Sequence, residues 1–280
     1  MKFYFFGVVV SLALISLDLL DVKSDCDLRI ITLAFILYPK FMKKIAIVAG
    51  GSGLVGMQLL HQLFQEQAYD VVIAVGRREL ALKHGKLVQV KVDFETIQNV
   101  DLEDKLREND FGGRNHSLIS SLNSKIFAIH AFCTMGTTIK KAGSKEMFEK
   151  IDHDYVINYA KWVRALGATK FLFVSAIGAD QQASFFYNKV KGKTEAHLKQ
   201  IDFTYLGILQ PSLLLGNRKE VRIGEDIGKI LGRIITSFGL LKKYKPIPDY
   251  KVAKAMIFHA LEKNELRLEY IPSMAMQDFD

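Results

Sequence analysis

The feature that most constrains this 280-residue chain is a glycine-rich turn between a short apolar run and an amphipathic stretch. The run "IAIVA" is typical of a strand covered on both faces, and Gly50, Gly53 and Gly56 follow it at G-x-x-G-x-x-G spacing. Gly50 permits a tight turn, Gly53 lets backbone approach a pyrophosphate, and Gly56 lets the following helix pack close to the strand. Free N–H groups and the dipole at the helix start favour phosphate. The turn therefore predicts nucleotide binding.

The same alternation of short β-rich runs and helix-length amphipathic stretches continues along the chain. Near-continuous apolar runs such as "FLFVS" indicate strands in a parallel sheet with helices on either side. With 49% hydrophobic and 24% charged residues, the chain has an ordinary folded composition and is long enough for one sizeable α/β domain. We therefore expect a doubly wound, mainly parallel α/β domain. Its candidate strands are residues 44–49, 71–75, 88–92, 126–132, 170–174 and 203–209.

The end of the second candidate strand indicates which dinucleotide the turn would hold. Folds that bind NAD place an acidic residue about 20 positions after the glycine turn, where it binds the ribose hydroxyls. This chain has "VVIAVGRREL" instead, so Arg77 and Arg78 offer two guanidinium groups to a 2′-phosphate, and we expect no carboxylate to compete. Asp93 and Phe94 close the third strand and border the adenine, although an ordinary turn explains them nearly as well. These residues predict NADP(H) over NAD(H).

A serine, a tyrosine and a lysine carry the candidate chemistry. Ser175 ends the fifth strand, and Tyr187 and Lys191 follow four residues apart on one face of a predicted helix. Lowering the pKa of a tyrosine from about 10 by about 3 units takes roughly 4 kcal/mol. One ammonium about 4 Å away supplies an interaction of that order. Tyr187 would exchange a proton with a substrate hydroxyl or carbonyl while Ser175 hydrogen-bonds the same oxygen and Lys191 holds the nicotinamide ribose.

With these motifs the chain resembles the atypical branch of the short-chain dehydrogenase/reductase superfamily that includes the Tat-interacting-protein oxidoreductases. The resemblance runs from about residue 43 to 261 and rests on "AGGSGLVG", "GRREL", "VDFE", "CTMGTT", "IDHDYVINYAKWVRALGATKFLFVSAIGAD", "FYNKVKGKTE" and "LQPSLLLGNR". It implies a Rossmann-type fold, catalytic positions at Ser175, Tyr187 and Lys191, and a cofactor-lining loop at "CTMGTT". The cofactor positions are Gly50, Gly53, Leu54, Val55, Gly56, Arg77, Arg78, Asp93, Phe94, Gly136, Thr137 and Lys191.

The chain departs from this family pattern in three places. Gln210 and Ser212 stand where an Arg-Pro-Gly loop has its arginine and glycine. Asp152 stands where many relatives have an asparagine, so we assign no asparagine-based proton relay. The polar stretch 111–125 is longer than usual before the fourth strand, and a surface loop explains it better than a lid.

The net charge and the positions of the cysteines and histidines indicate which kinds of partner the chain can bind. The net charge of +8 would suit an anionic partner, but the basic residues are scattered and lack the interleaved aromatics of a nucleic-acid platform. The histidines show no metal-ligand spacing, and the two cysteines, Cys26 and Cys133, form no disulfide framework. We therefore expect a small-molecule substrate, no nucleic acid and no metal. A buried structural thiol is the better interpretation of Cys133.

The residues before Met42 form an apolar N-terminal extension, 1–41, that nothing in the proposed chemistry requires. Its longest apolar run, 3–17, is shorter than the roughly 20 residues that span a bilayer, and no A-x-A-like cleavage site follows it. Three explanations stay open: a mis-called start, a membrane anchor, or an export signal. We expect residues 42–280 to form one cytoplasmic domain, or a cytoplasmic domain on a membrane anchor.

The expected function is that of an NADP(H)-dependent oxidoreductase acting on a carbonyl or alcohol carbon, with Tyr187 as acid/base. A small C-terminal cap, formed roughly by 223–240 and the final helix, would complete the substrate pocket together with 136–145 and 176–186. The alternative is a non-catalytic, NADP(H)-sensing regulatory or interaction protein. The substrate itself cannot be read from these residues.

Overall fold

The computed structural model describes residues 43–108, 127–216 and 244–279. The chain divides into two units, Met1–Lys43 and Lys44–Asp280, and the architecture below is that of the second. The N-terminal extension 1–41, the polar stretch 111–125 and the cap segment 223–240 lie outside the described residues. Among the helices that are described, none is long and apolar enough to cross a membrane.

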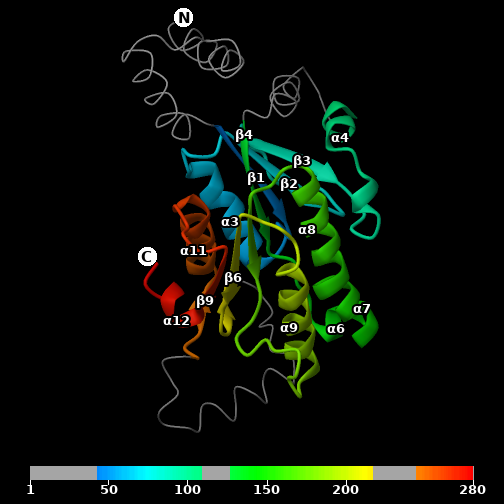
Figure 1. Cartoon of the computed structure of the whole chain (residues 1–280). Coiled ribbons are helices and arrows are strands. Elements are labelled where there is room, and N and C mark those ends of the chain that lie inside the picture. Colours follow the sequence, from blue (N-terminus) through cyan, green and yellow to red (C-terminus); the bar gives the residue numbers. More distant parts are fainter. Residues whose placement is uncertain (1–42, 109–126, 217–243, 280) are drawn as a thin grey trace, which may run out of the picture. The chain divides into compact units, whose positions relative to one another are not determined.

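A seven-stranded sheet forms the centre of the unit (Figure 1). Its strand order is β3-β2-β1-β4-β5-β6-β9, and the pairs β1–β2, β2–β3, β4–β5, β5–β6 and β6–β9 are parallel. The order starts at β1 and extends in both directions, as in a doubly wound fold. The strands are β1 (Lys43–Ala49), β2 (Val71–Gly76), β3 (Leu87–Lys91), β4 (Phe127–Cys133), β5 (Lys170–Val174), β6 (Tyr205–Gln210) and β9 (Leu268–Pro272).

Helices cover both faces of this sheet. Figure 1 shows α3 and α11 on one side and α8 and α9 on the other. The described helices are α3 (Leu54–Gln65), η1 (Ile97–Asn99), α4 (Leu102–Glu108), α6 (Ile139–Ala142), α7 (Lys145–Glu149), η2 (Lys150–Asp154), α8 (Tyr155–Ala165), α9 (Phe186–Leu198), α11 (Asp249–Leu261) and α12 (Ser273–Met276). The element η2 is a π-helical turn between α7 and α8. Two short parallel strands, β7 (Leu214–Leu215) and β8 (Ile247–Pro248), form a separate two-stranded sheet.

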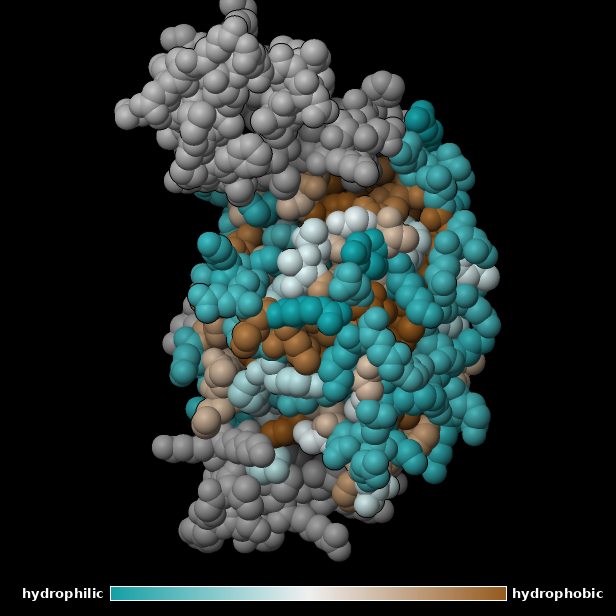
Figure 2. All heavy atoms as spheres, viewed as in Figure 1, coloured by the Kyte–Doolittle hydropathy of each residue, from teal (hydrophilic) through white to brown (hydrophobic). Residues whose placement is uncertain are grey.

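Two buried clusters, one on each face of the sheet, form the hydrophobic core. Alternate residues of β1 separate between them: Ile45 and Ile47 join the cluster that contains α8, while Ala46 and Val48 join the cluster that contains α3 and α11. Strands buried on both faces need apolar residues at successive positions, which explains the continuous run "IAIVA". Figure 2 shows hydrophilic residues over most of the visible face, with apolar residues in the gaps between them.

The observed architecture confirms the expected α/β fold, and it adds elements at the C-terminal end. Each of the six candidate strands is present, with ends that shift by no more than two residues. The seventh strand, β9, and the β7–β8 pair were not among the candidates. The helix α11 packs against α3, β5 and β6, so it belongs to the layer that covers the sheet.

Candidate active site

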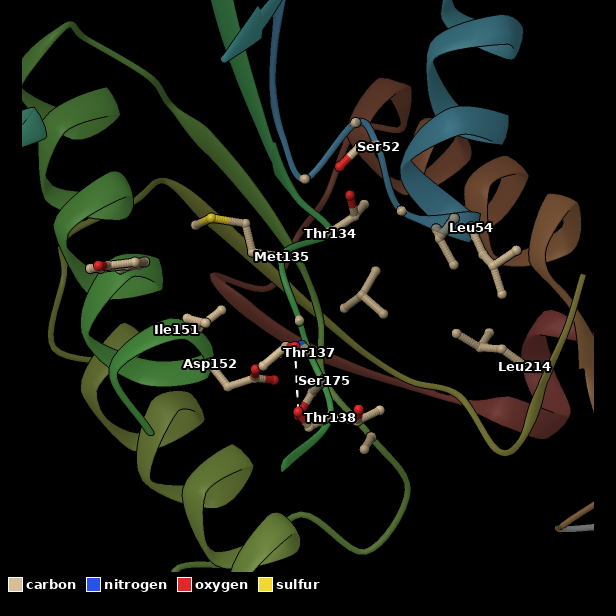
Figure 3. Close-up of a pocket in the computed structure, with 18 of the residues that line it drawn as sticks. Ser52, Leu54, Thr134, Met135, Thr137, Thr138, Ile151, Asp152, Ser175 and Leu214 are labelled. Carbon is tan, nitrogen blue, oxygen red and sulfur yellow. Dashed lines mark hydrogen bonds between the residues drawn. The ribbon is translucent and has the colours of Figure 1, made fainter. Parts of the chain in front are cut away.

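A cavity of about 800 Å³ opens at the carboxyl ends of the parallel strands. It is lined by residues that follow β1, β2, β4, β5 and β6 (Figure 3). Ligands of open α/β sheets bind at this edge, where the strand order reverses. Of the predicted site residues, those that line the cavity are Gly50, Gly53, Leu54, Val55, Arg77, Arg78, Phe94, Gly136, Thr137, Ser175, Tyr187 and Lys191; Gly56 and Asp93 do not.

The glycine turn is shaped as a cradle that side chains would fill. Gly50 has a φ of +86°, and an added Cβ would lie 2.6 Å from the backbone nitrogen of Met135. A Cβ on Gly56 would lie 2.2 Å from the carbonyl oxygen of Gly50, so Gly56 serves close packing of α3 against the turn. Gly53 is the N-cap of α3, where no side chain caps the helix, and no acidic residue stands in its first turn. These features fit a dinucleotide pyrophosphate.

Two arginines and a glutamate that follow β2 line the cavity. Arg77 and Arg78 follow β2, are exposed, and line the cavity as expected. Glu79 is also exposed and lines the same cavity. A carboxylate thus lines the same cavity as the two arginines, and the expectation that none competes for a 2′-phosphate stays a prediction.

The pair Asp93 and Phe94 separates into one residue that lines the cavity and one that does not. Phe94 is buried and stacks on Tyr155, with ring centroids 6.1 Å apart. Asp93 is exposed, and its carboxylate accepts a hydrogen bond from the backbone N–H of Glu95 at 2.9 Å. The structure thus places Phe94 in the cavity wall and gives Asp93 the role of an ordinary turn residue.

A buried ion pair in the wall of the cavity joins η2 to α9. The ammonium of Lys191 lies 3.0 Å from Oδ1 of Asp152, and both side chains are almost fully buried. Oδ2 of Asp152 accepts a hydrogen bond from the backbone N–H of Thr137 at 2.8 Å, and Figure 3 shows Asp152 directed toward the Thr137 loop. Burial opposes the charge of Lys191, but Asp152 and then Tyr187 outweigh it and raise the pKa of the ammonium. Lys191 is thus held as a cation.

Gly136 and Cys133 lie close to this ion pair. A Cβ on Gly136 would lie 3.4 Å from Oδ1 of Asp152 and 3.7 Å from Nζ of Lys191. Cys133 is fully buried at the end of β4, and burial raises the pKa of its thiol to about 12. A protonated, buried thiol is a weak nucleophile, which agrees with the structural role expected for this cysteine.

Tyr187 and Ser175 both line this cavity. Tyr187 is half-buried on α9, where its ring packs 5.7 Å from that of Phe148, and its charge interaction with Lys191 shows that the two groups are close. Ser175 follows β5, and its hydroxyl donates a hydrogen bond of 2.5 Å to Oε1 of Glu195. The structure therefore brings the three predicted residues into one cavity, but it turns the Ser175 hydroxyl toward a carboxylate.

Known proteins of similar sequence align with most of the chain. Protein HTATIP2 of Rattus norvegicus is 29% identical over 241 residues, which cover 85% of this chain and 89% of that protein. Protein FMP52, mitochondrial, of Meyerozyma guilliermondii is 34% identical over 221 residues, covering 78% and 85% of the two chains. The corresponding protein of Debaryomyces hansenii is 31% identical over 220 residues, covering 78% and 88%.

The chain belongs to the HTATIP2/FMP52 family of atypical short-chain dehydrogenases/reductases. No family model matches it.

Solved structures share the fold of this HTATIP2/FMP52-family chain at low sequence identity. MoeE5 in complex with UDP-glucose and NAD has a TM-score of 0.55 at 13% identity, covering 81% of this chain and 75% of that one. WbmG of Bordetella bronchiseptica in complex with NAD has a TM-score of 0.54 at 14% identity, covering 84% and 74%. A putative NAD-dependent epimerase/dehydratase from Bacillus halodurans has a TM-score of 0.52 at 15% identity, covering 82% and 97%. These similarities establish a Rossmann-type fold.

Two carboxylates of this HTATIP2/FMP52-family chain were missed as members of the site. The sequence marks Asp152 only as a departure from an asparagine and gives Glu195 no role. Glu195 lies four residues after Lys191 and eight after Tyr187, so helical spacing alone would have placed all three on one face. No spacing in the sequence indicates the contact between Asp152 and Lys191, because the two residues are 39 positions apart.

Proposed function

We propose that the chain is an NADP(H)-dependent oxidoreductase that reduces a carbonyl or oxidises an alcohol, with Tyr187 as the acid/base. The observation that carries this proposal is the buried, cationic Lys191 beside Tyr187 on one face of α9. A nearby ammonium favours the phenolate of Tyr187 and so makes proton exchange easier near neutral pH. A bound nicotinamide would supply or accept the hydride.

The side chains divide the remaining work between binding and positioning. The turn at Gly50 and Gly53, with the N-terminus of α3, would hold the pyrophosphate. Lys191 would hold the nicotinamide ribose, and Asp152 orients Lys191. Ser175 would contact the reacting oxygen of the substrate. The volume of the cavity suits a small-molecule substrate.

NADP(H) is the proposed cofactor because two guanidinium groups, Arg77 and Arg78, follow β2 and line the cavity beside one carboxylate, Glu79. Arginine suits a 2′-phosphate because its planar fork donates two hydrogen bonds to phosphate oxygens. Binding of NADPH and NADH by the parent and by Arg77→Ala/Arg78→Ala tests this preference. We expect the double variant to lose about tenfold or more in NADPH affinity while NADH affinity changes little. Tighter binding of NADH by the parent would assign the ribose hydroxyls to Glu79 instead.

The Tyr187→Phe variant tests the chemical role. The substitution removes only the hydroxyl and keeps the ring against Phe148. With a panel of carbonyl compounds, we expect NADPH oxidation by the variant to fall by about 10²-fold or more, at unchanged NADPH affinity. Tyr155→Phe is the matched control, because Tyr155 lines the same cavity from α8. If the parent binds NADPH but reduces no member of the panel, the non-catalytic sensor is the better assignment.

The cytoplasmic location stays a prediction. The fungal relatives are named mitochondrial proteins, which favours neither the cytoplasm nor the membrane for this chain.

A further inference from the structure

Glu195 is a buried carboxylate that the proposed reaction does not use. It lies on α9 with 5% of its surface exposed, behind the cavity wall formed by Ser175. Its Oε1 accepts two hydrogen bonds, from the Ser175 hydroxyl at 2.5 Å and from Nε2 of Gln210 at 3.0 Å. Ser175 follows β5 and Gln210 ends β6, so the carboxylate bridges the ends of two adjacent strands.

The contact with Glu195 decides whether the Ser175 hydroxyl can donate a hydrogen bond into the cavity. A serine hydroxyl has one proton to donate and two lone pairs that accept. When Glu195 is ionised, the Ser175 hydroxyl donates its one hydrogen bond to the carboxylate. It can then only accept a hydrogen bond from a group in the cavity. When Oε1 is protonated, Glu195 donates to Ser175, and the Ser175 proton becomes available to the cavity. The first state suits a substrate hydroxyl, which donates, and the second suits a carbonyl oxygen, which accepts.

The surroundings of Glu195 act on the pKa of its carboxyl group in opposite directions. Burial raises the pKa of its carboxyl group above the ordinary value, while the hydrogen bonds from Gln210 and Ser175 and the ammonium groups of Lys191 and Lys199 oppose that rise. Lys191 lies on α9 itself, and Lys199 is the C-cap of that helix. From η2, Asp152 faces the same region but is engaged with Lys191, and from β5 and β6 the facing partners are the uncharged Ser175 and Gln210.

We propose that Glu195 is a positioning residue that sets the direction of the Ser175 hydrogen bond and thereby selects between a carbonyl and an alcohol at the reacting oxygen. The catalytic part of this inference rests on the proposed oxidoreductase function, because it requires Ser175 to contact the substrate. The hydrogen-bond switch itself is a property of the folded protein.

A titration that needs no turnover tests the switch. Carboxyl ¹³C NMR of the full chain with bound NADPH would follow Glu195, whose signal is identified by its absence in Glu195→Gln. We expect a titration above the ordinary value of about 4.3, which moves up by about one pH unit in Ser175→Ala, because the carboxylate loses a donor. Gln210→Arg should move it down by about one unit or more, because a cation then faces the carboxylate.

Ser273→Ala is the control for these variants, since Ser273 is also buried but hydrogen-bonds to Ser212. A Glu195 signal that titrates at the ordinary value, or that stays in place in Ser175→Ala, overturns the proposal whatever the activity of the protein.

The kinetic consequence is measured on the parent and on Glu195→Gln, whose amide oxygen still accepts from Ser175 and Gln210. In the parent, we expect kcat/KM for carbonyl reduction to fall as pH rises through the Glu195 titration. In Glu195→Gln that fall should vanish, while the fall caused by Tyr187 at higher pH remains. Superimposable profiles overturn the proposal. If the parent reduces no carbonyl, the oxidoreductase assignment fails, and the NMR titration alone decides whether Glu195 sets the direction of the hydrogen bond.

Discussion

Asp152 holds the centre of the candidate site through two acceptor oxygens that serve two different donors. Oδ1 faces the ammonium of Lys191 at 3.0 Å, and Oδ2 accepts from the N–H of Thr137 at 2.8 Å. Both the aspartate and the lysine are almost fully buried. A buried charge that loses its partner is strongly destabilising, because it keeps its desolvation penalty without compensation.

At the residue scale, we therefore predict that Asp152→Asn destabilises the protein. The amide has one acceptor oxygen, so it cannot serve both Lys191 and Thr137. The expected loss is about 3 kcal/mol in the free energy of unfolding, measured by urea denaturation. Asp154→Asn is the control, because Asp154 is two residues away and largely exposed, where it contacts His153.

Addition of Lys191→Met to Asp152→Asn should recover part of that loss, because no uncompensated charge is then left buried. An Asp152→Asn variant as stable as the parent would show that the ion pair is not a stabilising contact.

At the scale of elements, α9 gathers the chemistry and two neighbours hold it in place. Tyr187, Lys191 and Glu195 recur every four residues and share one face of this helix. The π-helical turn η2 supplies Asp152 and His153, and Nε2 of His153 lies 2.6 Å from Nδ1 of His197 on α9. Such π-helical turns are often found at functional sites, where they place side chains that a regular α-helix would turn away.

Gly192 lets the loop after β5 approach α9. An added Cβ would lie 2.2 Å from the backbone carbon of Asp180 and 2.4 Å from the nitrogen of Gln181. Asn188 ties the same loop to the helix by donating to the carbonyl of Ile177 at 3.0 Å. The loop forms one wall of the cavity, so the fit of backbone against helix also shapes the site.

We predict that Gly192→Ala destabilises the protein although alanine is the better helix former. The gain in helix propensity is about 1 kcal/mol, whereas the overlap with backbone should cost about 3 kcal/mol, so the net loss should be about 2 kcal/mol. The midpoint of urea denaturation should fall, and NADPH-dependent activity with it. At Gly85 an added Cβ meets nothing within 4 Å, so Gly85→Ala should leave both nearly unchanged. Equal stability of the two variants would contradict the close approach.

At the scale of the whole molecule, a histidine within the core links stability to pH. His130 is buried in β4, where its Nδ1 forms a 2.8 Å hydrogen bond with the Tyr69 hydroxyl. Burial, with smaller contributions from Lys170 and Lys44, lowers the pKa of His130 from 6.5 to about 3. The folded protein therefore holds this imidazole neutral across most of the acidic range.

The resulting pH dependence has a definite sign. Because the folded pKa lies below the unfolded one, the unfolded chain takes up a proton first as pH falls below about 6.5. Stability should be greatest above this pH and should decline by about 1.4 kcal/mol per pH unit toward pH 3. In His130→Asn, whose amide can still form a hydrogen bond with Tyr69, that part of the slope should vanish. His84→Asn, at an exposed histidine, should keep it, and parallel slopes for all three proteins would contradict the assignment.

Much of the fold could be predicted because its signals are local. Continuous apolar runs identified the strands of the doubly wound sheet, and Gly50, Gly53 and Gly56 identified its first turn. The strand β9 escaped because "LEYIP" is half exposed at the sheet edge and lacks that continuous pattern. The position of Glu79 in the cavity wall needed the structure for a different reason, since the path of three successive residues after a strand depends on a loop that no short pattern describes.

Residue spacing within one strand, turn or helix was sufficient to predict the Rossmann-type fold, the glycine cradle and the shared face of Tyr187 and Lys191. Only the tertiary structure decided that Asp152 pairs with Lys191 and that Glu195 accepts a hydrogen bond from Ser175. Those contacts join η2 to α9 and α9 to the ends of β5 and β6, which lie together because of strand order and helix packing. Local sequence encodes backbone preference, whereas these partners meet only after the sheet has assembled.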